Sequence, residues 1–257
     1  MIAHIGIHEK AAIEVDLNKP IDISIPIKNG DNNPNCYWAE DVRFETIRAE
    51  GFVGSVAEGG SVNYQKLTLT PHGNGTHVEC YGHITNSGTT VSSQLKNFHF
   101  YAKLITLTPE KSTNGDLVIQ LNDVVKQTNW EGIKALIIRT FPNDREKLVR
   151  SYSGTNPPYF SKELIEYIVD KGIEHLLVDL PSLDKEVDGG VLAAHNAFWA
   201  LHGQLRKNAT ITELVYVRDT IPDANYLLNL QTINLEMDAA PCKPTLYAIE
   251  KFIPLKA

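Results

Sequence analysis

The stretch 161-SKELIEYIVDKGIEHLLVDL-180 predicts a helix followed directly by a buried strand. Apolar residues recur at the spacing of one helix face: Leu164, Ile165 and Ile168. Ser161 stands in front of this face as an expected N-cap, and Gly172 stands near its end as an expected stop signal. The apolar run 175-HLLVDL-180 then suits a strand that is covered on both faces.

The same alternation continues on both sides of this stretch. Before it, 134-KALIIRT-140 is a second apolar run of strand length. After it, 190-GVLAAHNAFWALHGQL-205 predicts another helix and 210-TITELVYV-217 predicts the next strand. Strands and helices that alternate at this spacing indicate a parallel or mixed sheet with helices packed on it.

The first part of the chain is instead rich in short β-type segments separated by turn-forming residues. These segments are 21-IDISIPI-27, 43-RFETI-47, 61-SVNYQKLTLT-70 and 102-AKLITLT-108. The sequence contains no repeat and no linker-like composition. We therefore predict one domain over residues 1–257, of the α/β class, with an antiparallel-rich N-terminal half.

The overall composition excludes several classes of protein. The chain has 257 residues, of which 42% are hydrophobic and 21% charged, and its net charge of −7 argues against a nucleic-acid partner. Three cysteines without CxxC spacing favour a reducing compartment over a disulfide framework. No apolar run approaches the roughly 20 residues that a membrane span requires. We expect a soluble cytoplasmic protein.

The most unusual segment is 71-PHGNGTHVECYGHI-84, which contains three histidines and a glutamate. If residues 76–83 are extended, His77, Glu79 and His83 share one face of the strand, because side chains alternate. Such nitrogen and oxygen donors suit Zn²⁺, Mn²⁺ or Fe²⁺. The spacing alone leaves a histidine-rich polar turn as the alternative.

Other polar residues interrupt apolar elements further along the chain. They are Asp179, Ser182 and Asp184 after the buried strand, His195 within the second predicted helix, and Glu213 within the last predicted strand. Each one alone fits a hydrogen-bonded core residue. A glutamate in an apolar strand is costly unless it is paired or binds a metal, and this favours a functional role for Glu213.

These segments together resemble the cyclase family of metal-dependent hydrolases, which includes bacterial kynurenine formamidase and isatin hydrolase. The stretch 75-GTHVECYGH-83 is similar to the family signature HxGTHxDxPxH. Further segments resemble family segments in the same order: 21-IDISIPIKNG-30, 135-ALIIRT-140, 159-YFSKELIEYIVDKGIEHLLVDLPSLD-184, 192-LAAH-195, 211-ITEL-214 and 234-NLEMDAAPCKPTLYAI-249.

The resemblance implies a compact α/β fold of the swivelling β/β/α type, with a mixed sheet or open barrel and packed helices. It implies homodimers or homotetramers and one or two divalent metals per chain, commonly Zn or Mn. Matched by position, His77 and Glu79 are metal ligands, and His195 and Glu213 resemble the ligands of a second metal. His83 matches the histidine that transfers protons.

This chain departs from the family pattern at several positions. The first histidine of the signature falls at Gly73, whereas His72 stands one residue earlier, so either the turn bulges and His72 still reaches the metal or that ligand is lost. Glu79 replaces an aspartate, and Tyr81 replaces the signature proline. Because His195 and Glu213 are widely spaced, His202 is an alternative to His195. The chain therefore represents a divergent branch.

We predict a metal-dependent hydrolase that opens a small cyclic or aryl amide, or a related ester or lactone, with a metal-activated water. His83 is the expected general acid and base. Tyr37 and Trp38 follow the opening strand, where they form either one wall of the substrate pocket or ordinary core packing. The alternative function is a small-molecule binding protein on a degenerate, inactive site, which the missing histidine at position 73 favours.

Overall fold

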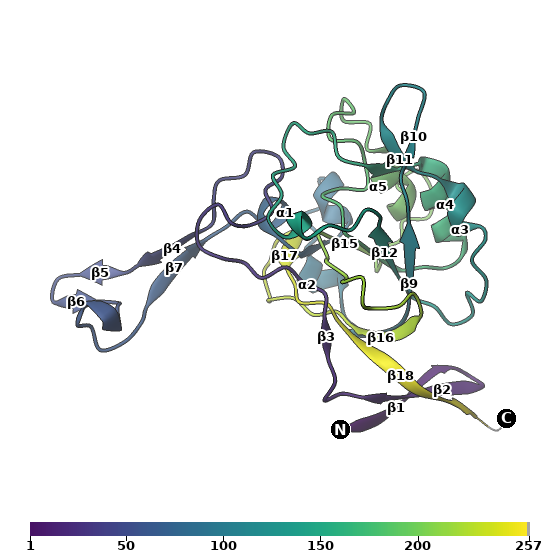
Figure 1. The fold of residues 1–257 in the computed structure, drawn as a ribbon, viewed down its shortest axis with the longest axis horizontal. Helices are drawn as coiled ribbons and strands as arrows, with labels where there is room; N and C mark the ends of the chain where they lie inside the picture. The colour runs from purple at the N-terminus through teal and green to yellow at the C-terminus, as the bar shows by residue number, and fades with distance from the viewer. Residues whose placement is uncertain (256–257) are drawn as a thin grey trace.

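In the computed structural model, which describes residues 1–255, the chain forms a mixed α/β domain around an eleven-stranded sheet (Figure 1). Four parallel strands occupy the middle of this sheet: β9 (His99–Leu107), β12 (Ala135–Thr140), β14 (His175–Val178) and β15 (Thr210–Glu213). Every residue of β12 and β14 is buried. The predicted two-sided burial of these strands is confirmed.

Antiparallel strands extend the sheet on both sides. Next to β15 lie β8 (His77–Glu79) and then β17 (Ala239–Pro241). On the other side, β9 is followed in order by β16 (Asn225–Asn229), β18 (Thr245–Pro254), β2 (Ala11–Asp16) and the edge strand β1 (Ile2–His8). The short β3 (Ile21–Asp22) also pairs with β18. The sheet is thus parallel in the middle and antiparallel toward both edges. The predicted mixed sheet is confirmed.

Alternate residues of the central strands pack into two different cores. Leu136 and Leu176 face helices α4 (Lys162–Asp170) and α5 (Ala193–Trp199), while Ile137 and Leu177 face the opposite core. The N-cap of α4 is Ser161, whose Oγ accepts a hydrogen bond from the backbone N–H of Leu164 at 3.3 Å. The remaining α-helices are the single turns α1 (Pro71–Asn74), α2 (Val91–Gln94) and α3 (Leu121–Val124). Within residues 1–255, no helix is long and apolar enough to cross a membrane.

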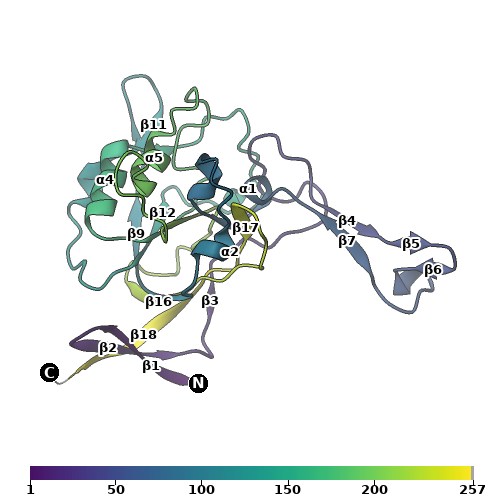
Figure 2. The same ribbon diagram turned by 180° about the vertical axis from the view of Figure 1, so that it is seen from behind.

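Two small elements project from the main body. The first is an arm formed by paired strands β4 (Arg43–Thr46) and β7 (Gln65–Thr68), with β5 (Arg48–Ala49) and β6 (Phe52–Val53) at its tip (Figures 1 and 2). The second contains β1, β2 and the end of β18. A separate small sheet joins β10 (Glu110–Lys111), β11 (Leu117–Ile119) and β13 (Tyr159–Phe160).

Several predicted elements are shorter in the structure than the sequence pattern indicates. The strand predicted over 21–27 comprises only β3, because the backbone N–H of Ile25 bonds to the Oγ1 of Thr76 instead of a strand partner. The helix predicted over 190–205 is α5 alone. It ends where Ala200 takes a left-handed conformation, with φ 52°. The strand predicted over 210–217 likewise ends at Glu213, because Leu214 has φ 54°.

Candidate metal centre

Strand β8 brings two predicted site residues to one face of the sheet. It lies between β15 and β17, with His77 opposite Glu213 and Glu79 opposite Ile211. Val78 points into the apolar core on the other side, and Cys80, just after the strand, packs into the same core. His77 and Glu79 are both almost completely buried, at 0% and 1% exposure. The predicted alternation is therefore confirmed for residues 77–79.

The condition that residues 76–83 are extended throughout is not met. Strand β8 ends at Glu79, Cys80 is still extended, and a 3₁₀ turn from Tyr81 to Ile84 follows, with the backbone N–H of His83 bonded to Cys80 O at 2.9 Å. The chain packs so closely here that a Cβ on Gly82 would lie 2.1 Å from the Thr89 carbonyl oxygen. The turn still places His83 Nε2 3.8 Å from Glu79 Oε2.

His72 lies in the cluster despite its displacement by one residue. It sits in the single turn α1, with Nδ1 3.2 Å from Glu79 Oε2 and Nε2 3.0 Å from Asp238 Oδ2. A side chain at position 73 has no room, since a Cβ on Gly73 would lie 2.4 Å from the Cβ of Ala39. The local turn thus presents His72 instead of residue 73.

Helix α5 and strand β15 supply the remaining predicted residues. His195 Nε2 lies 3.2 Å from Glu79 Oε1 and 3.8 Å from Glu213 Oε1. Glu213 Oε2 lies 3.4 Å from His77 Nε2. His202, the alternative to His195, is exposed and lies beyond the end of α5. The structure therefore places His195, and not His202, beside the carboxylates.

Hydrogen bonds to the nitrogen that faces away from the cluster fix the orientation of two of these imidazole rings. His77 Nδ1 bonds to the carbonyl oxygen of Gly75 at 2.9 Å, and His195 Nδ1 bonds to Asp184 Oδ2 at 2.6 Å. In both rings Nε2 is left facing the cluster. Metal-binding histidines in proteins are held in this way, by an oxygen acceptor on the nitrogen that does not bind the metal.

Contacts within the cluster shift the pKa values of its imidazole and carboxylate groups toward their charged forms. Burial opposes protonation of His195, but hydrogen bonds to Asp184 and Glu79 raise its pKa to about 10. In the same way, Glu79 and Asp238 overcome the effect of burial and raise the pKa of His72 to about 9. Burial favours the neutral acid at Glu79, yet the neighbouring histidines lower its pKa well below the usual value. The direct contacts between the carboxylates and the imidazole rings thus account for all three shifts.

A further observation indicates that the cluster fits a divalent cation. Three completely buried atoms make no well-directed hydrogen bond within the described residues: His77 Nε2, Glu79 Oε2 and Glu213 Oε1. Their near contacts are ion pairs with neighbouring cluster residues, such as that of Glu79 Oε2 with His72 Nδ1 at 3.2 Å. Buried polar atoms are nearly always satisfied, so three such atoms in one cluster favour a bound cation as their partner. Ligand atoms of His72, His77 and Glu79 lie within 4.8 Å of one another, as do those of Glu79, His83 and His195. Nitrogen and oxygen donors without thiolate suit Zn²⁺ or Mn²⁺.

The chain matches the family model described as "Putative cyclase" over residues 15–185. It belongs to the putative cyclase family. It is 28% identical over 224 residues to a kynurenine formamidase from Bacillus cytotoxicus, covering 87% of this chain and 94% of the relative. It is 26% identical to a kynurenine formamidase from Bacillus anthracis, over 90% of this chain and 99% of the relative.

Solved structures support the fold of this cyclase-family chain. A potential metal-dependent hydrolase with cyclase activity matches with a TM-score of 0.66 at 18% identity, covering 91% of this chain and 99% of the other. Isatin hydrolase A from Labrenzia aggregata, bound to benzyl benzoate, matches with a TM-score of 0.65 at 14% identity, over 90% and 94% of the two chains. The predicted cyclase-like fold is confirmed.

Of the three polar residues predicted after strand β14, two lie beside the cluster or its cavity and one lies away from it. Asp184 holds His195, and Ser182 borders the same cavity as the cluster. Asp179 does not contact the cluster. Its carboxylate is fully buried, 2.8 Å from Lys147 Nζ, and also accepts hydrogen bonds from Thr140.

Asp238 was missed as a site residue by the sequence analysis. It precedes β17 and bonds to both His72 Nε2, at 3.0 Å, and His83 Nδ1, at 3.2 Å. Its signal was present in the segment 238-DAAP-241, which resembles the C-terminal segment of the cyclase family. Apart from this resemblance, nothing in the local sequence distinguishes it from a surface aspartate, because its partners lie more than 150 residues away.

A cavity of about 320 Å³ opens onto the cluster. His72, His83, His195 and Glu213 border it, and Tyr37 lies at its edge. Trp38 is 69% exposed and is not among the described residues that line it. Of the two aromatic residues predicted for a pocket wall, the structure thus places only Tyr37 at the cavity.

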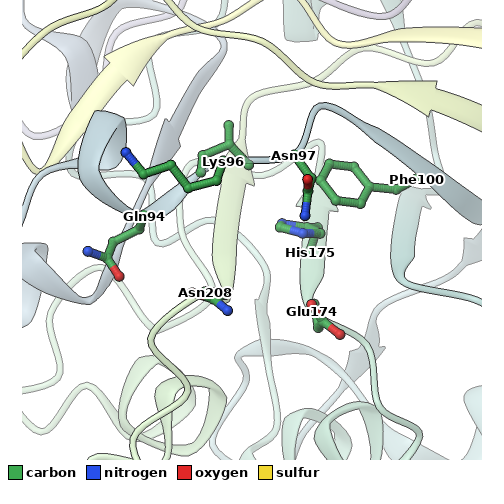
Figure 3. A pocket seen from close by; sticks show the side chains of 8 residues that line it. Gln94, Lys96, Asn97, Phe100, Glu174, His175 and Asn208 are labelled. Carbon is green, nitrogen blue, oxygen red and sulfur yellow. The ribbon is translucent and has the colours of Figure 1, made fainter.

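A second, separate cavity lies near the amino end of β14 (Figure 3). Here the His175 ring packs on Phe100, with ring centroids 3.9 Å apart, and its Nδ1 bonds to the Thr210 hydroxyl at 2.9 Å. His175 is 3% exposed. Burial lowers its pKa to about 4.

This histidine is expected to make stability depend on pH. Its folded pKa lies below the unfolded value of 6.5, so its contribution is complete above pH 6.5 and is lost as the pH falls toward about 4. At 1.36 kcal/mol per pH unit the loss approaches about 3 kcal/mol. Unfolding by urea at pH 7 and pH 4 measures it, with His175→Asn as the comparison. An equal pH dependence in both proteins would contradict the expectation.

Proposed function

We propose that this chain is a metal-dependent hydrolase that cleaves the C–N bond of a small cyclic or aryl amide, a formamide or lactam, or opens a related ester or lactone. The observation that carries the proposal is that three buried atoms of one side-chain cluster beside a cavity, His77 Nε2, Glu79 Oε2 and Glu213 Oε1, make no well-directed hydrogen bond within the described residues. Curated relatives that cover nearly the whole chain are kynurenine formamidases, and this supports the reaction class.

His72, His77, Glu79, His195 and Glu213 would hold one or two divalent ions, Zn or Mn. Close contacts link their side chains, since Glu79 contacts His72 and His195, and Glu213 contacts His77 and His195. In such a site, a bound divalent cation lowers the pKa of a coordinated water from 15.7 to about 7 and polarises a carbonyl group.

His83 is the proposed general acid and base. Its side chain is 33% exposed and borders the cavity, and it is the most exposed of the cluster histidines that do so. Asp238 Oδ2, 3.2 Å from Nδ1, fixes the ring and leaves Nε2 directed toward Glu79. His83 would take a proton from the attacking water and return it to the leaving nitrogen or oxygen.

The size of the cavity favours a small substrate. At about 320 Å³ it lies at the lower end of the range of roughly 300–1,000 Å³ for ligand pockets. One aromatic ring with an attached amide fits this space better than an extended chain does. Isatin hydrolase, a structural neighbour, is named for such a compact cyclic substrate.

Hydrolysis of a defined substrate panel tests the proposal. The purified protein, supplied with Zn²⁺ or Mn²⁺, is assayed with formanilide, isatin and an aryl lactone, before and after chelation. We expect turnover of at least one amide, lost on chelation and restored by metal. Binding without turnover would support the alternative of an inactive small-molecule binding protein. Unfolding on chelation without any turnover would indicate a metal that only stabilises the fold.

The remaining expectations stay predictions. We propose a small-molecule substrate as the ligand, no nucleic-acid or membrane partner, and a homodimer or homotetramer in the cytoplasm. The net charge of −7 supports the absence of a nucleic-acid partner.

A further inference from the structure

We propose that Tyr37 is a catalytic residue of this site, whose hydroxyl donates a hydrogen bond to the carbonyl oxygen of the bound amide. The inference rests on the proposed function and adds to it a residue outside the ligand cluster. It follows from a turn that the chain holds in a strained conformation at the edge of the cavity.

Residues 36–39 form a tight turn with two unusual central residues. The backbone N–H of Ala39 bonds to Cys36 O at 3.1 Å, and the residues between them, Tyr37 and Trp38, have φ 55° and 53°. Turns with positive φ at both central positions normally contain Gly, Asn or Asp. Large aromatic residues are disfavoured there, so their presence indicates a role that compensates for the strain.

The turn packs directly on the segment that carries His72. The backbone N–H of Cys36 bonds to Gly73 O at 3.0 Å, and Asn74 Nδ2 bonds to Glu40 O at 3.1 Å. A Cβ at position 73 would lie 2.4 Å from the Cβ of Ala39 and 3.1 Å from Cys36 O. The absence of a side chain at Gly73, where the family signature has a histidine, is what lets the turn approach this closely.

Contacts on the other side prevent the turn from relaxing. Trp38 N–H donates to Ser153 Oγ at 2.8 Å, and Asn35 pairs with the segment 150–152 through two backbone hydrogen bonds of 3.1 and 2.7 Å. The turn is therefore anchored both to α1 and to the loop after Arg150. Its conformation directs Tyr37 to the cavity and leaves Trp38 69% exposed.

Tyr37 lines the cavity that opens onto the cluster, although 44% of the residue is exposed. Burial raises the pKa of this hydroxyl far above its ordinary value, the Glu213 carboxylate acts in the same direction, and Ser182 opposes them. A phenol with an ordinary pKa near 10 is neutral at pH 7, so the hydroxyl is available there as an O–H donor. Of the other donors that line the cavity, Lys185 is engaged by Asp116 at 2.7 Å, and the histidines belong to the cluster. Ser182 is the other neutral hydroxyl that lines the cavity, and its Oγ accepts a hydrogen bond from the backbone N–H of Asp184 at 3.2 Å.

The step keeps Tyr37 chemically unchanged. Water adds to the carbonyl carbon, negative charge develops on the carbonyl oxygen, and the C–N bond then breaks as a proton passes to nitrogen. The Tyr37 O–H bond remains intact and its hydrogen bond strengthens as the oxygen becomes charged. A donor placed in this way stabilises the transition state more than the bound substrate.

The conservative variant Tyr37→Phe tests the proposal, with Tyr64→Phe on the projecting arm as the matched control. For an amide that the wild-type enzyme hydrolyses, we expect Tyr37→Phe to lower kcat about a hundredfold while KM changes by less than about threefold. Metal content and thermal unfolding should stay at wild-type values. A kcat within about twofold of wild type, or an equal loss in Tyr64→Phe, would overturn it.

An infrared measurement tests the contact without any turnover. ¹³C-carbonyl oxindole, a simple lactam, is bound to the wild-type protein and to Tyr37→Phe, with and without added Zn²⁺. A hydrogen bond lowers the carbonyl stretching frequency, so we expect the lower frequency in the wild-type protein. Identical frequencies in the two proteins would overturn the assignment. If no amide is hydrolysed, the proposed function fails while this comparison still decides whether Tyr37 meets the carbonyl.

Discussion

Replacing His77 by alanine is expected to remove bound metal and activity together. Its Nε2 is buried, makes no well-directed hydrogen bond and lies 3.4 Å from Glu213 Oε2, and its other ring nitrogen is held by Gly75 O. Alanine leaves the facing carboxylates without a shared cation. We expect loss of at least one metal ion per chain and a fall in kcat/KM of a hundredfold or more, about 2.7 kcal/mol of transition-state stabilisation.

Elemental analysis and turnover assays of the same samples measure both effects. The matched control is His99→Ala, because His99 is an exposed histidine of β9 that contacts Asn229 and not the cluster. This control should retain its metal and its rate. Full metal occupancy in His77→Ala would contradict the assignment of His77 as a ligand.

Lys147→Met is expected to cause the largest loss of stability outside the site. Lys147 is 3% exposed, and its ammonium group lies 2.8 Å from Asp179 Oδ2 and bonds to two oxygens of Thr140. Burial already raises the pKa of Asp179, and Lys147 opposes that shift. Removing one partner of a buried ion pair leaves an uncompensated charge, which costs about 3–5 kcal/mol.

Equilibrium unfolding in urea measures this loss. Lys162→Met is the control, because its ion pair with Glu166 is exposed and such pairs contribute at most about 1 kcal/mol. The double variant Lys147→Met/Asp179→Leu removes both charges and should recover much of the stability. A loss below about 1 kcal/mol in Lys147→Met would show that the buried pair is not needed.

The parts of the fold with strong periodic patterns were predictable from the sequence. Strands β12 and β14 and helix α4 have runs in which burial and hydrophobic spacing agree, so their local pattern determines the element. The same holds for His77 and Glu79, which share a face because side chains alternate along β8. Element ends were less predictable, since they depend on backbone conformations such as that of Ala200.

The candidate site was only partly predictable, for a specific physical reason. Whether His72 reaches the cluster depends on Gly73, and Gly73 depends on the turn 36–39 packed against it. His83 arrives through a 3₁₀ turn and not along the strand, and Asp238 approaches from the other end of the chain. These contacts join distant segments, so no local pattern in the sequence reports them.

The metal content of protein purified without added metal tests the central claim most directly. We predict about one or two Zn or Mn ions per chain, with turnover of an aryl formamide or lactam that chelation abolishes and the same metal restores. A metal-free protein that chelators neither inhibit nor destabilise would contradict the account.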